Sequence, residues 1–129
     1  MSYSQPQQIT YTTGAITTTA AAVTIPIRGP KGKQGRLRDV IARCTTTHVL
    51  GSTPTELKIG LSGTLTAYGD FLPAAMTAPT ATTLSDLPGA SVLGTAIIPA
   101  DTVVLLTTVA NTTGSPAGVI TYDVIIDWF

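Results

Sequence analysis

The chain has few charged residues, one cysteine, one histidine and few aromatic residues. Charged residues make up 11% of its 129 residues, whereas an ordinary soluble domain carries about 25%. Cys44 stands alone, so an intrachain disulfide is excluded. His48 is the single histidine, so neither a His-rich site nor a structural zinc site is expected. Aromatic residues are 5% of the chain and lie away from the basic residues, whereas nucleic-acid binders interleave the two. We therefore expect no metal, no cofactor and no nucleic-acid partner.

Long apolar runs are also missing. The longest fall far short of the roughly 18 residues that a membrane span requires. The N-terminal stretch is polar and lacks the basic start and apolar run of a signal peptide. The sequence thus predicts no membrane partner. It also predicts a protein that is made in the cytoplasm and stays there until it leaves as part of a larger particle.

Threonine takes the place of charge on the expected surface. It is the commonest residue and occurs in runs such as Thr17–Thr19 and Thr45–Thr47. A β-branched hydroxyl residue suits the half-wet face of a sheet. The formal net charge is zero, and proteins near neutrality associate readily because they repel one another little. This surface predicts association with copies of the chain or with partners.

The basic stretch Arg28–Arg38 holds five of the seven basic residues among glycines. It is not a Walker A loop, because Gly29 and Gly32 are only three residues apart and Gln34 follows Lys33. We interpret it as a basic, flexible turn.

Two roles remain open for this turn. Lys31, Lys33 and Arg36 are candidates for docking onto acidic groups of a partner. The alternative is a solvated turn in which Arg36 and Arg38 protect a sheet edge. Every acidic residue except Asp39 lies from Glu56 onward. Two interpretations of this asymmetry stay open: the charged segments are solvated loops, or the early basic segment of one subunit attracts the late acidic half of another.

No pair of side chains predicts catalysis. Cys44 and His48 share a strand face but lie about 13 Å apart at strand rise, too far for a nucleophile and its base. Asp123 and Asp127 share a face at the same separation and fit solvent or interface carboxylates better than a glycosidase pair. The sequence predicts a protein that is not an enzyme.

The apolar residues alternate or form short runs between Gly and Pro, which predicts an all-β chain. In the last stretch, Gly118–Phe129, the side chains of Ile120, Tyr122, Val124, Ile126 and Trp128 share one face. We expect Trp128 and Tyr122 to anchor the core.

Further strands are expected at 20–27, 36–47, 55–60, 65–68, 94–98 and 102–109. The last of these should be a central strand and form a hairpin with the final strand. Residues 73–89, with three prolines, should be an irregular excursion. This spacing predicts a single-domain antiparallel β-sandwich or jelly roll over residues 15–129. Residues 1–14 are expected to be an arm laid across a partner, or else a frayed terminus.

Four short pieces of this Thr-, Ala- and Gly-rich chain resemble the auxiliary capsid proteins of tailed bacteriophages, also called decoration or cement proteins. The pieces run through 32–40 (GKQGRLRDV), 98–101 (IPAD), 114–118 (GSPAG) and 123–129 (DVIIDWF). The resemblance implies a β-sandwich or jelly roll, often a homotrimer. It further implies a virion protein that binds the major capsid protein on the outer surface of the expanded head and reinforces the lattice.

Two other classes stay open at this point. The chain fits another virion component, such as a small capsid, head-completion or tail protein. It also fits a carbohydrate-binding β-sandwich module, although such sites need a platform of exposed aromatic residues.

Overall fold

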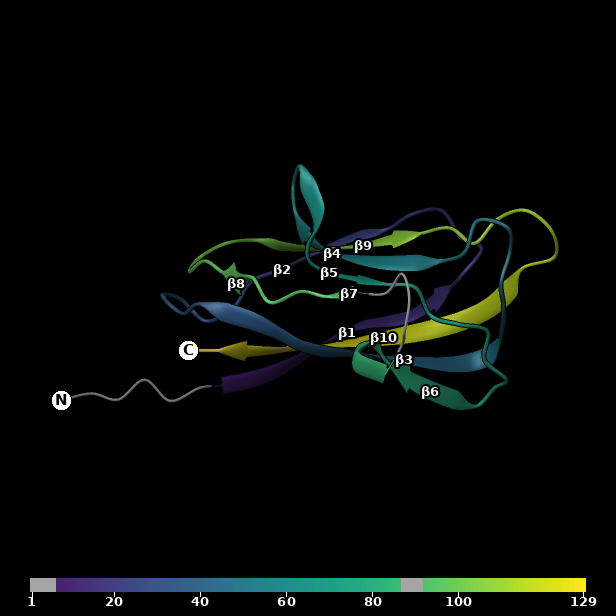
Figure 1. Cartoon of the computed structure of the whole chain (residues 1–129), viewed down its shortest axis with the longest axis horizontal. Helices are drawn as coiled ribbons and strands as arrows, with labels where there is room; N and C mark the ends of the chain where they lie inside the picture. The colour runs from purple at the N-terminus through teal and green to yellow at the C-terminus, as the bar shows by residue number, and fades with distance from the viewer. Residues whose placement is uncertain (1–6, 87–91) are drawn as a thin grey trace.

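A computed structural model describes residues 7–86 and 92–129 of the chain. They form two antiparallel sheets packed face to face, with sheet B above sheet A in Figure 1. The expected all-β sandwich is confirmed. Sheet A contains, in spatial order, β1 (Gln7–Thr17), β10 (Ala117–Trp128), β3 (Gly35–Val49) and β6 (Thr80–Thr83), and β8 (Ile97–Ile98) pairs with one end of β3. Sheet B contains β2 (Thr24–Ile27), β9 (Val104–Val109), β4 (Glu56–Leu61), β5 (Thr64–Phe71) and β7 (Val92–Leu93).

The core lies between the two sheets and follows from the alternation along the strands. Every second side chain of β10 is buried, and β3, β4 and β9 turn similar rows toward it. Burying one such aliphatic side chain contributes about 1.5–3 kcal/mol. Phe71 of β5 meets Tyr122 of β10 edge to face across the core, with ring centroids 5.8 Å apart. The core side chains of the central strands are Leu37, Val40, Ala42, Cys44, Leu57, Ile59, Val104, Leu106, Ile120, Tyr122, Val124, Ile126 and Trp128.

The expected hairpin between residues 102–109 and the final strand is wrong. β9 is a central strand, as expected, but it belongs to sheet B between β2 and β4, whereas β10 belongs to sheet A. Both strands turn one row of buried side chains toward the core. A buried row shows that a strand faces the core but not which sheet it joins, because β3 and β10 also turn such rows to the core while they pair side by side in sheet A.

The connection from β9 to β10 is anchored by Asn111, whose side chain is buried. Its Nδ2 donates to the carbonyl of Val49 at 2.8 Å, and its Oδ1 accepts the N–H of Gly51 at 2.7 Å. Its own backbone N–H donates to the carbonyl of Thr18 at 2.7 Å. One side chain and its backbone thus join three connections at this end of the sandwich.

The boundary expected at residue 14, between an arm and the sandwich, falls inside β1. Gln7 to Thr17 pair with β10 from Trp128 back to Val119. Residues 7–14 therefore belong to sheet A, because Ile9 and Tyr11 pack against the core and hold the strand in place. Residues 1–6 of the expected arm lie outside the described residues.

The excursion expected at 73–89 contains more structure than its prolines indicated. β6 pairs with β3 from Thr80 to Thr83, and a 3-10 helix follows at Leu84–Asp86. Leu84 is buried in the core. Residues 87–89 lie outside the described residues. No helix within 7–86 and 92–129 is long and apolar enough to cross a membrane.

Candidate interaction surface

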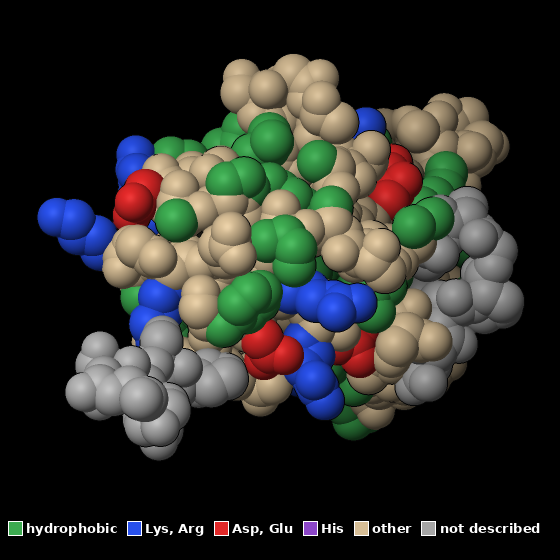
Figure 2. Space-filling model, turned by 60° about the vertical axis from the view of Figure 1, so that its left-hand side comes forward, with side chains coloured by type: hydrophobic (Ala, Val, Ile, Leu, Met, Phe, Trp, Pro, Cys, Tyr) green, Lys and Arg blue, Asp and Glu red, His purple; other side chains and the backbone are tan. Residues whose placement is uncertain are grey.

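The outer face of sheet A carries a concentration of charge that is unusual for this chain. Because alternate residues of β3 and β10 fill the core, the side chains between them point outward. β3 contributes Arg36, Arg38 and Arg43, and β10 contributes Asp123 and Asp127. Figure 2 shows one patch in which Lys or Arg side chains lie beside Asp or Glu side chains.

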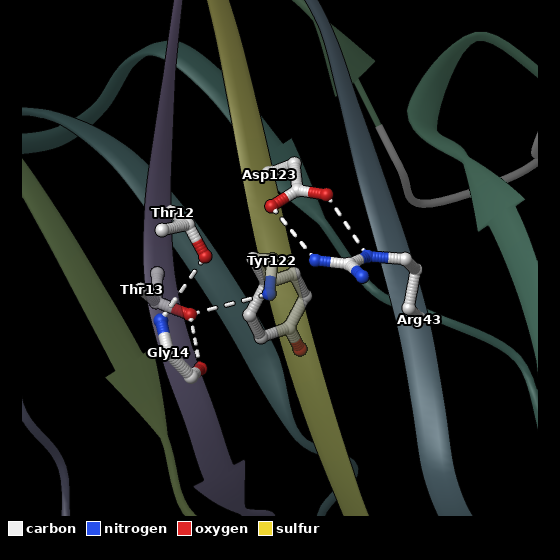
Figure 3. A network of polar contacts seen from close by, with 6 residues as sticks. All are labelled: Thr12, Thr13, Gly14, Arg43, Tyr122 and Asp123. Carbon is white, nitrogen blue, oxygen red and sulfur yellow. Dashed lines mark hydrogen bonds and ion pairs between the residues drawn. The ribbon is translucent and has the colours of Figure 1, made fainter.

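Two ion pairs cross from β3 to β10 on this face. Arg43 contacts Asp123 through Nε at 2.9 Å and through Nη2 at 3.2 Å, as Figure 3 shows. Arg38 Nη1 lies 3.4 Å from Asp127 Oδ2. Such exposed pairs contribute at most about 1 kcal/mol each. The attraction between the basic and the acidic parts of the sequence is thus satisfied, at these residues, within one chain.

A cleft of about 590 Å³ opens beside the charged face. It lies where β3 has left β8 and has not yet paired with β6. Asp39 of β3 closes one wall, since its carboxylate accepts both the N–H of Ser85 at 3.1 Å and the hydroxyl of Ser85 at 2.8 Å. The cleft is lined by Gln8, Arg36, Leu37, Arg38, Asp39, Ser85, Leu93, Gly94, Thr95, Ile125 and Asp127.

The basic turn connects β2 in sheet B to β3 in sheet A. Lys33 donates its backbone N–H to the carbonyl of Pro30 at 3.1 Å, and Gly32 has a φ of 77°. A glycine with positive φ at this position is typical of a type II turn. The N–H of Gly32 also donates to Asp101 at 3.0 Å. The turn is therefore held to a neighbouring loop, which differs from the flexible turn expected.

The three docking candidates have different environments. Lys31 is exposed at the turn, Arg36 is exposed on the outer face of β3, and Lys33 is half-buried. Lys33 has an interaction partner, so it is not a free cation. Among the residues that the structure describes, neither Lys31 nor Arg36 takes part in an ion pair.

Two glycines of the basic stretch make room for the ring of the core anchor Trp128. Sequence reasoning predicted the anchor but missed the role of the glycines. Trp128 is buried, and a Cβ at either Gly29 or Gly35 would lie 2.5 Å from its ring. The indole N–H donates to the Tyr11 hydroxyl at 3.0 Å, and that hydroxyl donates to the Arg28 carbonyl at 3.3 Å. No local pattern signals this contact, because both glycines are far from Trp128 in sequence.

Tyr122, the other core anchor, is buried at the centre of β10. Burial raises the pKa of its hydroxyl above the ordinary value. Its backbone N–H donates to the Thr13 hydroxyl at 3.2 Å, as Figure 3 shows. This contact ties the middle of β10 to β1 at the point where the pairing of the two strands becomes irregular.

Sheet B carries a carboxyl pair that sequence reasoning also missed. Glu56 of β4 and Asp70 of β5 lie close together on the outer face. Burial, a hydrogen bond with Asp70 and the negative charge of Asp70 raise the pKa of Glu56 to about 7, while the positive charge of Lys58 acts in the opposite direction. The pair is visible only once the register of β4 with β5 is known, because the two residues are distant in sequence.

Cys44 and His48 both lie on the buried face of β3. Burial lowers the pKa of His48, and the nearby carbonyls of Ala117 and Pro73 oppose this only in part. The Cys44 thiol faces the carbonyl of Met76 at 3.9 Å. Within 7–86 and 92–129, no three His, Cys, Asp or Glu side chains gather where they could hold a metal ion.

Comparison of the chain with protein-family models, with curated proteins and with solved structures finds no match.

Proposed function

We propose that the chain is a structural protein of a tailed-bacteriophage virion, which binds the outer surface of the capsid lattice and reinforces it. The resemblance of four short sequence pieces to decoration proteins supports this proposal. So does the molecular surface, which is poor in charge and rich in threonine around one charged face. The chain would be made in the host cytoplasm and function on the head.

The observation that carries the proposal is the uneven neutralisation of that face. Arg38 and Arg43 are paired with aspartates within the chain. Lys31 and Arg36 are exposed and, in the described part of the chain, have no ion pair. Lys31 lies in the turn that leads into β3, and Arg36 lies on the outer face of β3, where it also lines the cleft. Acidic groups of a capsid subunit would complete their pairing.

Such docking is weak for one molecule and effective for a lattice. Exposed ion pairs contribute at most about 1 kcal/mol and are screened beyond roughly 8 Å at physiological salt. A lattice repeats its sites, so linked contacts bind far more tightly than single ones. Binding of this kind should weaken steeply as salt is added.

The test compares two variants of equal net charge on emptied, expanded phage heads that lack their auxiliary protein. Lys31→Gln with Arg36→Gln, called the face variant, removes the positive charges of the turn and of the outer face that have no ion pair in the described part of the chain. Ser62→Glu with Thr64→Glu adds two negative charges at the exposed β4–β5 turn on sheet B. Head occupancy is measured by sedimentation over a series of salt concentrations.

We expect the wild type and the turn variant to bind stoichiometrically and the face variant to bind poorly at low salt. The wild-type advantage should shrink as salt rises. Equal occupancy of both variants would remove the docking role of Lys31 and Arg36. Absence of wild-type binding to any expanded head would contradict the capsid function itself.

A further inference from the structure

β1 is the one long edge strand among the strands that the structure describes. It is the last strand on its side of sheet A and pairs only with β10 (Figure 1). Every second residue of an antiparallel strand turns its N–H and C=O away from its partner. An edge of this length presents a row of hydrogen-bonding groups that another strand can occupy.

The other strands at the sheet edges are short or carry proline, although β7 covers β5 only at Gly69 and Asp70. β2 carries Pro26 in its middle, β6 has four residues, and β7 and β8 have two residues each. Proline and short length are two of the devices by which natural sheets prevent strand addition.

β1 lacks these protections over its first half. It has no charged residue and no proline. Its one irregularity lies between Thr12 and Ala15, where Gly14 has a φ of 73°. A bulge disturbs pairing from that point on. The stretch 7–12 (QQITYT) therefore remains a regular, uncharged edge.

The strands along this side of the sandwich carry no charged residue, and the nearest charges are Asp123 and Asp127 of β10, opposite Thr12 and Gln8. All seven basic and all seven acidic residues lie from Arg28 onward, so β1, β2 and their connection carry none. The apolar side chains along this side are only partly covered, and Val23 is 44% exposed. The partly buried ones are Ile9, Tyr11, Ile16, Ile25 and Ile27.

We propose that the β1 edge binds a second copy of the same chain by antiparallel pairing of residues 7–12 across a two-fold axis. Residues that face each other across two strands must lie on the same face of the sheet, which restricts the register. Centring the axis on Thr10 sets the two Thr10 residues opposite each other. It also places Ile9 of one copy opposite Tyr11 of the other, twice.

The register suits the side chains. An aromatic residue opposite a β-branched one is a favourable cross-strand pair, as is Thr opposite Thr. Ile9 and Tyr11 are partly exposed in the single chain and would be covered by each other. The Tyr11 hydroxyl already receives the Trp128 N–H, so its ring is held in place before the second copy arrives.

The absence of charge identifies a second copy as the occupant. In a two-fold contact each side chain near the axis meets its own counterpart, so any charge there would face a like charge. The uncharged strand β1 avoids this repulsion, whereas a charged partner strand would find no complementary group on β1 itself. The pairing holds two copies, in contrast to the trimer that the sequence resemblance implies. It does not depend on the proposed capsid function.

The first test measures mass by light scattering at micromolar concentration. The wild type should give twice 13.3 kDa. Thr10→Lys should weaken self-association by about tenfold or more, because two lysines would meet at the axis. Thr66→Lys, at an exposed strand position in sheet B, is the matched control and should leave the dimer intact.

The second test reads the register. Cys44 is buried, so Thr10→Cys adds the single accessible thiol. Directly opposed residues lie about 4.5–5.5 Å apart at Cα, within the range of a disulfide. Mild oxidation should convert most of the Thr10→Cys protein to a covalent dimer and little of the Thr66→Cys protein.

A monomeric or trimeric wild type would overturn the inference, and so would equal cross-linking at positions 10 and 66. The outcome is separable from the capsid test. If monomeric Thr10→Lys still binds expanded heads, the capsid function does not require the dimer. If the wild type is a dimer but binds no head, the β1 interface is supported and the capsid function is contradicted.

Discussion

Trp128 shows how a single residue sets requirements at distant positions. Its ring fills the space left by Gly29 and Gly35. We expect Gly35→Ala to lower the free energy of unfolding by about 1–3 kcal/mol, because the added methyl overpacks the core. Trp128→Ala should cost about 3–5 kcal/mol. Denaturant unfolding of both variants measures these values.

The double variant isolates the contact between the two residues. Once Trp128→Ala has emptied the site, Gly35→Ala should cost much less than it does in the wild type, since residues in contact are not additive. Equal costs in both backgrounds would show that the methyl meets something other than the indole.

Glu56 makes the stability of the protein depend on pH in a defined direction. Its folded pKa of about 7 lies above the ordinary 4.5, so the folded state holds a proton that the unfolded state has lost between these values. The contribution of Glu56 to stability is therefore full below pH 4.5 and is lost as the pH rises through 7. Solvent at this half-exposed pair limits the effect to about 1 kcal/mol.

The measurement compares the wild type with Glu56→Gln at each pH, which removes the opposite trend from His48. The unfolded state protonates His48 below about pH 6.5 while the buried folded side chain resists protonation, so its own contribution is lost as the pH falls. The wild-type stability relative to Glu56→Gln should be higher at pH 5 than at pH 8. A stability difference that does not change with pH would contradict the raised pKa of Glu56 and its interaction with Asp70.

At the scale of elements, Asn111 controls the connection that crosses from sheet B to sheet A. Asn111→Ala would leave the Gly51 N–H and the Val49 carbonyl without their partner, and each buried unpaired group costs about 1–3 kcal/mol. We expect a loss of about 2–4 kcal/mol in denaturant unfolding. Asn111→Asp keeps the acceptor for Gly51 but sets a buried carboxylate against the Val49 carbonyl, so at neutral pH it should cost at least as much as Asn111→Ala, and a smaller loss would argue against the Val49 contact.

The strands could be predicted from sequence where one face is apolar. β3, β4, β9 and β10 alternate clearly, and their rows fill the core. β1 and β6 were missed because threonine occupies both of their faces. β6 has no apolar residue larger than alanine, and Ile9 and Tyr11 form too short an alternation in β1 to indicate a strand of eleven residues. The hairpin was wrong for a related reason, since alternation shows which face is buried but not which sheet a strand joins.

The candidate surface was predictable only in part. Lys31 and Arg36 are exposed, as a basic turn implies. The pairing of Arg38 and Arg43 with aspartates depends on β3 lying beside β10, and the Glu56–Asp70 pair depends on the register of β4 with β5. Contacts between residues far apart in sequence follow from topology, which local patterns do not encode.

At the scale of the whole molecule, the two proposed surfaces are compatible. Pairing through β1 extends sheet A into the second copy without turning it over, because opposed residues share a face. Both charged outer faces would then point to the same side of the dimer. One dimer would present Lys31 and Arg36 twice to a lattice, and attachment at two sites strengthens binding beyond either site alone.

The pairing of Gln7 with Trp128 also decides how the molecule responds to tension. Because these residues are partners in adjacent antiparallel strands, the described chain enters and leaves the sandwich side by side, as Figure 1 shows. A pull that separates these two points is directed along the hydrogen bonds between β1 and β10, which are perpendicular to the strands. The bonds therefore open one after another from that end. Force applied there would peel β1 away from β10 and expose the indole of Trp128 first.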